Sequence, residues 1–255
     1  MLKPVELANL VPQSLQEIDR GHGSHKSYLA QIYTGSANFQ AFIKLIPDYE
    51  LAREITVAQL GKAIGLPTLA PIMVNVEGIP SETKYAFATV HKSEASNFTQ
   101  FANNDSIMRD HLKKWSLIKK AICFDEWIAN ADRTPENILI EGNNKYVLID
   151  HGESFPQSIQ PDSKYNNGLA RIVIDGIPKN EMEMACRKTI GSCSNFSLID
   201  FDDLSQNSRV ANWQGNEYIE GCIQVLKDRI SFLPELLEQE FMSGQRQFKY
   251  NDNNN

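Results

Sequence analysis

The apolar residues change their pattern along the chain, and this change constrains the fold more than any other feature of the 255 residues. Up to about residue 91 they occur in short runs rich in β-branched and aromatic side chains, separated by Gly, Asn and Pro, as in strands joined by tight turns. From about Ile107 they recur mostly at helical spacing. The chain is therefore predicted to be an α+β protein whose strands come mainly first and whose helices come mainly last.

The strand-rich part divides into short predicted elements. Three strands are expected within residues 15–46, followed by a helix from Pro47 to about Ile64 that Gly65 and Pro67 end. Two further strands are expected within residues 69–91.

The later part combines helices with one β-hairpin. Residues 117–129 place apolar side chains on one face of a helix, and the last third of the chain is expected to be mainly helical, most clearly over residues 217–237. Between them, short apolar strands at 138–140 and 146–149 flank the turn Gly142-Asn143-Asn144. The tail at residues 245–255 is polar and is expected to be disordered.

Composition excludes several classes of protein. Apolar residues make up 42% and charged residues 22%, which is ordinary for a globular chain, and the net charge of −7 argues against a nucleic-acid binder. No run approaches the roughly 18 apolar residues of a membrane-spanning helix. Residues 1–6 contain an early acidic residue and no apolar core of a signal peptide, and the four cysteines form no CxxC pair, so we expect a cytoplasmic protein.

The strongest chemical signal is a pair of motifs on either side of the predicted hairpin. Asn137 stands five residues after Asp132, and Asp150 stands thirteen residues after Asn137 and is followed by His151 and Gly152. Phosphoryl transfer from ATP needs a carboxylate that orients the attacking hydroxyl and oxygen ligands that hold Mg²⁺. The spacing fits Asp132 as the orienting carboxylate and Asn137 and Asp150 as metal ligands.

The same residues resemble a known family. The stretch 130–137 resembles the catalytic loop of HipA-like kinases, bacterial Ser/Thr kinases of toxin–antitoxin systems, and residues 149–152 are similar to the metal-binding turn of phosphatidylinositol kinases. The resemblance implies ATP and Mg²⁺ as cofactors. Arg133 fits either a catalytic role, neutralising charge in the loop, or a structural ion pair. Thr134 departs from family members that carry His after Asp-Arg.

A lysine in the strand-rich part provides a second, separate signal. Lys44 lies inside the apolar strand 42–46, where its ammonium needs a partner or a path to solvent. Glu54, ten residues later on the predicted helix, is placed to pair with it. Kinases use such a pair to hold the α- and β-phosphates of ATP.

The turn at residues 21–25 stands where a glycine-rich loop would cover the phosphates. Gly21 and Gly23 allow close approach of backbone N–H groups, although a third glycine is absent. The resemblance implies that Ser24 contacts the nucleotide and that it, or Ser27, is autophosphorylated.

These features together predict a two-lobed protein-kinase-like fold, with ATP between a β-rich N-terminal lobe at residues 1–92 and a mainly helical C-terminal lobe at 93–244. The predicted reaction is transfer of the ATP γ-phosphate to a Ser or Thr hydroxyl of a protein, and the resemblance adds an antitoxin or regulatory protein as a partner. The alternatives are a small-molecule or lipid kinase and a nucleotide-binding pseudokinase. No Ala-Pro-Glu-like segment follows Gly152, so the acceptor stays undefined.

Overall fold

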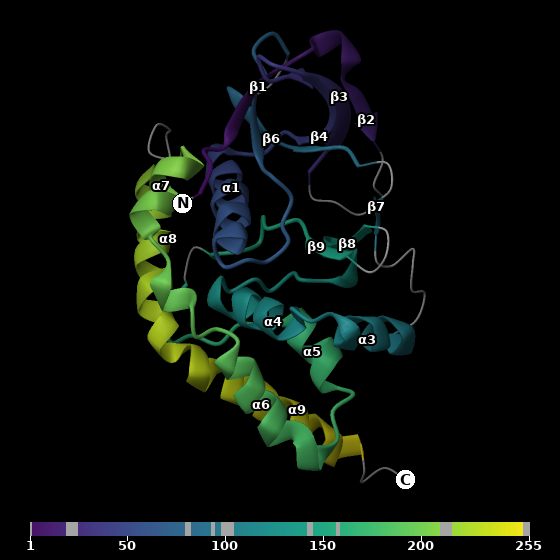
Figure 1. The fold of residues 1–255 in the computed structure, drawn as a ribbon, viewed down its shortest axis with the longest axis vertical. Coiled ribbons are helices and arrows are strands. Elements are labelled where there is room, and N and C mark those ends of the chain that lie inside the picture. The colour runs from purple at the N-terminus through teal and green to yellow at the C-terminus, as the bar shows by residue number, and fades with distance from the viewer. Residues whose placement is uncertain are drawn as a thin grey trace. The chain divides into compact units, whose positions relative to one another are not determined.

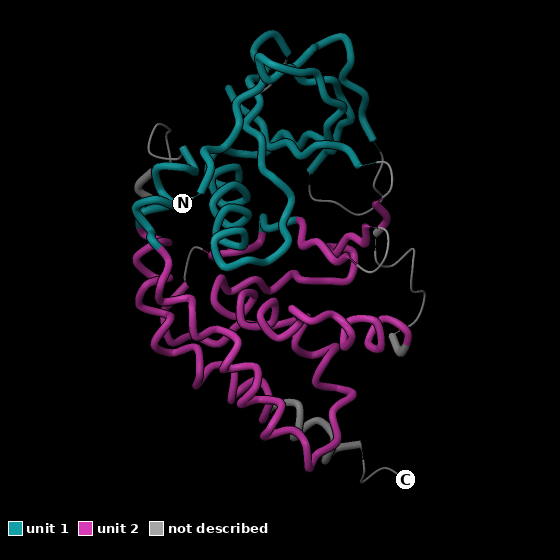
Figure 2. Tube along the Cα trace, viewed as in Figure 1, with its two compact units in different colours: residues 1–94, 150–152, 200–220 teal, residues 95–149, 153–199, 221–255 magenta. Residues whose placement is uncertain are grey.

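The computed structural model describes residues 2–18, 25–79, 83–92, 95–97, 105–141, 145–156, 159–209 and 216–251. The chain forms two compact units (Figure 2). The first contains residues 1–94, 150–152 and 200–220, and the second contains residues 95–149, 153–199 and 221–255. Two short segments from the later part of the chain thus belong to the strand-rich unit, which the predicted division after residue 92 does not include.

The first unit is built around a sheet in the order β1-β5-β6-β4-β3-β2 (Figure 1). An additional antiparallel pairing between β1 and β3 closes five of these strands into a ring, and β1 pairs with β5 in parallel. The strands are β1 (Glu6–Leu10), β2 (Gln16–Ile18), β3 (Ser27–Tyr33), β4 (Asn38–Lys44), β5 (Ile72–Asn75) and β6 (Tyr85–Val90).

The first unit contains two clusters of buried apolar side chains, which lie on opposite faces of the strands. One cluster contains small and branched side chains from five strands, with Ala41 and Ile43 of β4 among its fully buried members. The neighbouring positions Met73 of β5 and Phe87 of β6 are paired across the sheet and pack instead with Leu51 and Ile55 of helix α1 (Asp48–Ala63). Since successive side chains of a strand point to opposite faces, β5 and β6 contribute to both clusters.

Helix α1 begins and ends at the residues that the sequence predicts. Asp48 and Glu50 lie in its first turn, where negative charge is favourable, and Pro47 precedes it. Gly65 adopts a φ of +79° just beyond the helix, the left-handed conformation that commonly ends helices. Residues 51–61 are all buried, so α1 is a core helix of this unit.

Helix α7 (Phe201–Ser208) packs against α1, although more than 130 residues separate them in sequence. The carbonyl of Asn207 accepts a 2.8 Å hydrogen bond from the Val5 backbone N–H. Arg209 Nε in turn donates to the Val5 carbonyl at 2.8 Å. Asp200 caps α7 by accepting hydrogen bonds from the backbone N–H groups of Asp202 and Asp203.

The second unit contains a three-stranded sheet in the order β7-β8-β9 and most of the helices (Figure 1). Its strands are β7 (Ala95–Asn97), β8 (Ile138–Glu141) and β9 (Lys145–Leu148). Its helices are α3 (Asp105–Lys114), α4 (Ile118–Trp127), α5 (Gly168–Ile174), α6 (Met182–Gly191) and α9 (Leu233–Asn251), and α8 (Asn216–Arg229) contributes residues to both units.

Helix α4 lies at the centre of the second unit. Seven of its ten residues are at most 1% exposed, Trp127 and two acidic residues among them. The indole Nε1 of Trp127 donates to the Leu226 carbonyl at 2.9 Å, and its ring stacks on Phe196. Every polar group on such a helix must find a partner inside the protein.

The structure confirms the α+β class, with strands mainly in the N-terminal region and helices mainly in the C-terminal region. The C-terminal part is mainly helical, as expected. Residues 217–237 are divided between α8 and α9 by the 3₁₀ turn Ile230–Phe232, since Pro234 is tolerated only in the first turn of α9. Helix α9 also continues to Asn251, so residues 245–251 are helical; Gln, Arg and Lys there are good helix formers.

Strand β1 was not predicted, because its sequence Glu-Leu-Ala-Asn-Leu lacks the β-branched residues that mark the other strands of its sheet. Within the described residues, no helix combines the length and the apolar composition needed to cross a membrane.

Candidate active site

Lys44 is the last residue of β4, and its ammonium lies between two carboxylates of the first unit. Nζ is 3.0 Å from Glu54 Oε1 and 2.9 Å from Asp150 Oδ1. Glu54 projects from α1 and is 1% exposed, whereas the Asp150 side chain is 43% exposed. The structure thus brings together three residues that the sequence identified, from positions up to 106 residues apart.

Glu54 also holds the turn that follows Asp150. Its second oxygen, Oε2, accepts a 2.8 Å hydrogen bond from the backbone N–H of His151. The carbonyl of Gly152 accepts a hydrogen bond from the buried Arg53, one residue before Glu54 on α1. Two consecutive residues of α1 therefore fix the backbone of residues 151–152.

Asp150 has a left-handed backbone, with φ of +56°. Non-glycine residues adopt this conformation at a cost, and short polar residues such as Asp adopt it most readily. Such backbone conformations cluster at functional sites, where the surrounding contacts hold them in place. At Asp150 those contacts are the ion pair with Lys44 and the hydrogen bonds that α1 makes to the next two residues.

The three charges shift one another's pKa values. Burial acts to lower the pKa of Lys44, but the two carboxylates outweigh it and the pKa is raised above its ordinary value. Burial raises the pKa of Glu54, and Lys44 and the His151 N–H counteract only part of this effect. Burial also acts to raise the pKa of Asp150, yet Lys44 dominates and the pKa lies below its ordinary value. Lys44 is therefore a persistent cation beside an ionised Asp150.

Asp132 and Asn137 lie in the second unit, in the loop between α4 and β8. Asn137 Nδ2 donates to the Asp132 carbonyl at 2.7 Å and lies 3.5 Å from the Asp132 carboxylate. Asn130 Oδ1 accepts from the Asp132 backbone N–H at 3.0 Å. The carboxylate of Asp132 is exposed, whereas the loop that carries it is held by its own hydrogen bonds.

Arg133 is buried beneath this loop. Its guanidinium binds Asp125 of α4 through Nε and Nη2 at 3.1–3.2 Å, and both side chains are fully buried. Nη1 donates to the carbonyls of Asn137 at 3.2 Å and of Ile149 at 2.5 Å. Because the side chain is enclosed, its contribution is to position the loop.

The same contacts attach the end of β9 to the loop. The backbone N–H of Ile149 donates to the Asn137 carbonyl at 3.1 Å, while Arg133 binds the Ile149 carbonyl. Asp150 is the next residue of the chain. Asp125 holds the Arg133 side chain that makes these contacts. Burial raises the pKa of Asp125, although Arg133 acts to lower it.

Asp125 was not predicted as part of the site. The signal was present, because a carboxylate on the apolar face of a predicted helix needs a buried cation as partner. Gly21, Gly23 and Ser24 of the predicted phosphate-covering loop lie outside the described residues. His25, at the end of that loop, lies 2.7 Å from Glu50 of α1.

Oxygen ligands for Mg²⁺ are present in the two predicted residues, the Asp150 carboxylate and the Asn137 amide. Within the described part of the chain, no three His, Cys, Asp or Glu side chains group as a metal site. A nucleotide-bound Mg²⁺ does not require such a group, because one or two protein oxygens complete a shell of phosphates and water. The donor types present therefore fit Mg²⁺ held together with phosphates.

Three comparisons relate the chain to known proteins. Among solved structures, the chain is similar to the Helicobacter pylori proinflammatory kinase CtkA, at 12% identity and a TM-score of 0.49, over 84% of this chain and 94% of that chain. No curated protein sequence matches the chain. A family model described as HipA-like kinase matches residues 20–190, which include Lys44 and residues 130–137. This match spans well over half of the chain, and the chain therefore belongs to the HipA-like kinase family.

Proposed function

We propose that this kinase transfers the γ-phosphate of ATP, in the presence of Mg²⁺, to a Ser or Thr hydroxyl of a protein. The observation that carries the proposal is the placement of Lys44 between the buried Glu54 and the partly exposed Asp150. The Ser/Thr preference follows the resemblance to HipA-like kinases. An antitoxin or regulatory partner is proposed on the same ground.

Lys44 would bind the phosphates of ATP as a fixed cation. Its ammonium is held at the end of β4 by Glu54, whose carboxylate is buried and hydrogen-bonded on both oxygens. The raised pKa of Lys44 keeps the charge over the whole physiological range. The adenine ring would lie against β6, near Phe87–Val90.

Asp150 and Asn137 would hold Mg²⁺. One lysine and two carboxylates leave an excess negative charge at Asp150, and the exposed fraction of that carboxylate allows a further cation to bind. When bound, Mg²⁺ neutralises charge on the transferring phosphate. The Asn137 amide, already directed by its hydrogen bond to the Asp132 carbonyl, would supply an uncharged oxygen ligand.

Asp132 would orient the acceptor and take its proton. The hydroxyl oxygen attacks the γ-phosphorus, the bond between that phosphorus and the β–γ bridging oxygen breaks, and ADP leaves. The hydroxyl proton passes to the Asp132 carboxylate. Arg133 would keep Asp132 in place through its buried contacts with Asp125 and Ile149.

The test is incubation of the purified protein with γ-³²P-ATP and Mg²⁺, alone and with a cell lysate. Label on proteins, removed by Asp132→Asn and unaffected by Asp202→Asn at an exposed position of α7, supports the proposal. Label on extracted lipids or small molecules would select the alternative acceptors instead. Nucleotide binding without turnover would identify a pseudokinase.

A further inference from the structure

Two cysteine side chains of the second unit meet where helix α4 packs against α6. Cys123 belongs to α4 and is fully buried, whereas Cys193 lies in the turn at residues 192–195 that follows α6 and is partly exposed. Both are free thiols, and they lie within hydrogen-bonding reach of each other. The fold thus brings together two thiols that are far apart in the sequence.

Two neighbouring carbonyl groups at the end of α6 hold these thiols. Cys123 Sγ donates to the Thr189 carbonyl at 3.0 Å, and Cys193 Sγ donates to the Ile190 carbonyl at 2.9 Å. Each carbonyl also accepts a backbone N–H of the turn, that of Ser192 at 2.9 Å and that of Cys193 at 3.2 Å. Loss of the two S–H protons therefore leaves neither carbonyl without a donor, which keeps the cost of oxidising the pair low.

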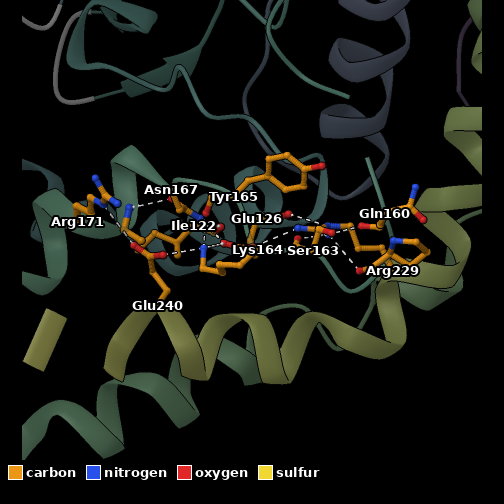
Figure 3. Close-up of polar contacts among 12 residues, drawn as sticks. Ile122, Glu126, Gln160, Ser163, Lys164, Tyr165, Asn167, Arg171, Arg229 and Glu240 are labelled. Atoms are coloured by element: carbon orange, nitrogen blue, oxygen red, sulfur yellow. Dashed lines mark hydrogen bonds and ion pairs between the residues drawn. The ribbon is translucent and has the colours of Figure 1, made fainter. Parts of the chain in front are cut away.

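Helix α4 holds Cys123 in a fixed position, because residues on both sides of it are bound by buried side chains. The Ile122 carbonyl accepts from Asn167 Nδ2 at 2.9 Å (Figure 3). The Glu126 carboxylate binds Arg229 at 3.2 Å, and both of these side chains are fully buried. The partner cysteine lies in a turn, outside the helical hydrogen-bond ladder. The turn is therefore the part that can adjust when two sulfurs approach to the roughly 2 Å of a disulfide bond.

The two thiols differ in reactivity. A hydrogen bond from Cys123 lowers the pKa of Cys193, although burial acts to raise it, so the partly exposed sulfur is also the more nucleophilic one. The same hydrogen bond, together with burial, raises the pKa of Cys123 well above its ordinary value. Burial, with a smaller contribution from Glu238, raises the pKa of Cys186 on α6 to about 11. A nucleophilic thiol beside a second thiol is the arrangement that converts an oxidised sulfur into a disulfide.

We propose that Cys123 and Cys193 form a redox modification site, which a hydroperoxide converts into a disulfide between α4 and the end of α6. The Cys193 sulfur attacks a peroxide oxygen, the O–O bond breaks, and a sulfenic acid forms while water or an alcohol leaves. The Cys123 sulfur then attacks the Cys193 sulfur, the S–O bond breaks, and water leaves. The peroxide takes up the two electrons and two protons that the thiols lose, and a dithiol reductant reverses the change.

The disulfide joins the helix that holds the loop of the proposed phosphotransfer to a distant part of the same unit. Asp125, two residues after Cys123, binds the Arg133 side chain in this loop. The bridge replaces none of these contacts, and it closes a long stretch of chain, so it should stabilise the folded state. The inference does not depend on the proposed function.

The test treats the reduced full chain with hydrogen peroxide, blocks the remaining thiols with iodoacetamide and maps unreduced peptides by mass spectrometry. Wild type should give a peptide pair that joins Cys123 to Cys193 and is about 2 Da lighter than the two thiol peptides, and dithiothreitol should separate it. The midpoint of thermal unfolding should rise by at least about 4 °C on oxidation. Before oxidation, iodoacetamide should alkylate Cys193 at least about tenfold faster than Cys186.

Variants assign the two roles. Cys193→Ser should form no linked pair, and Cys123→Ser should leave a sulfenic acid on Cys193 that dimedone traps. Cys186→Ser is the matched control on α6 and should form the same linked pair as wild type.

Absence of the linked pair in wild type overturns the inference, as does a disulfide that uses Cys186 or Cys222 or that joins two copies of the chain. A midpoint of unfolding that stays the same or falls after oxidation also overturns it, because the thiols would then not be placed for a bridge in the folded state. These measurements on wild type decide the matter even if a serine variant does not fold. They use no ATP, so their failure is distinct from failure of the proposed function.

Discussion

Two clusters of charged side chains in this kinase differ in balance and in exposure. The cluster of the first unit has one cation, Lys44, for two carboxylates, and Asp150 is 43% exposed. In the second unit Asp125 is paired with Arg133 and Glu126 with Arg229, and all four side chains are fully buried; Lys164 also binds Glu126 and joins it to the buried Glu240, so each carboxylate there has a cationic partner. The first cluster can accept another ion, whereas these pairs are complete.

The difference shows how to separate residues for chemistry from residues for structure. A buried, balanced pair loses much of its Coulombic gain to desolvation, so its use is to hold particular segments together. An unbalanced, partly exposed cluster with a strained backbone at Asp150 is poorly suited to that purpose and suited to binding. Changes in the two clusters should therefore affect different measurements.

The largest effect is expected from Arg133→Met. It leaves Asp125 buried without its cation, which should lower the free energy of unfolding by about 3–5 kcal/mol. Urea unfolding followed by circular dichroism measures this. The double variant Asp125→Leu/Arg133→Met should recover much of the loss, and a loss below about 1 kcal/mol for the single variant would show that the pair does not hold the loop.

Asp132→Asn should leave stability almost unchanged and strongly lower the rate of phosphate transfer. Because the carboxylate is exposed, the free energy of unfolding should stay within about 0.5 kcal/mol of wild type. The rate of phosphate transfer should fall at least about 100-fold, equivalent to about 2.7 kcal/mol of activation free energy. If the variant transfers phosphate at the wild-type rate, Asp132 has no role in the reaction. Asp202→Asn is the control for loss of an exposed carboxylate and should keep the wild-type rate.

The sequence predicted the local part of the site. Asp132 and Asn137 are five residues apart on one loop, and Lys44 and Glu54 lie on a strand and the helix that follows it, so spacing alone indicated both pairs. Their chemical types also indicated the family, which the match over residues 20–190 confirms.

The contacts that spacing does not encode were missed. Arg229 and Glu126 are 103 residues apart, and α7 joins α1 from the far end of the chain. Such pairs depend on how the elements pack, which a single sequence does not specify. The parallel pairing of β1 with β5 is of the same kind, because it joins strands more than 60 residues apart.

Lys44→Met tests the link between charge and stability in the first cluster. The pKa of Asp150 is lowered below its ordinary value of 3.8, so its contribution to stability is present above about pH 4 and is lost as the pH falls through the folded value. The pKa of Lys44 is raised above 10.5, so its contribution persists below that pH and is lost as the pH rises through the folded value.

The free energy of unfolding should therefore differ between wild type and Lys44→Met by about 1–3 kcal/mol between pH 5 and 9. The difference should shrink at acidic pH, as Glu54, whose pKa is raised, is protonated first and Asp150, whose pKa is lowered, is protonated at still lower pH. Lys145→Met, at an exposed position of β9, controls for loss of a surface lysine. A difference that is constant from pH 3 to 9 would mean that Lys44 stabilises the fold without its charge.

The most direct measurement is titration calorimetry of ATP binding to wild type and Asp150→Asn, with Mg²⁺ and with EDTA. If the Asp150 carboxylate binds Mg²⁺, the variant should bind Mg·ATP at least about tenfold more weakly than wild type, a loss of about 1.4 kcal/mol in binding free energy. Its affinity for metal-free ATP should be unchanged or higher, because a negative charge near the phosphates is gone. Equal losses under both conditions would contradict the account and leave Asp150 as a residue that only shapes the turn.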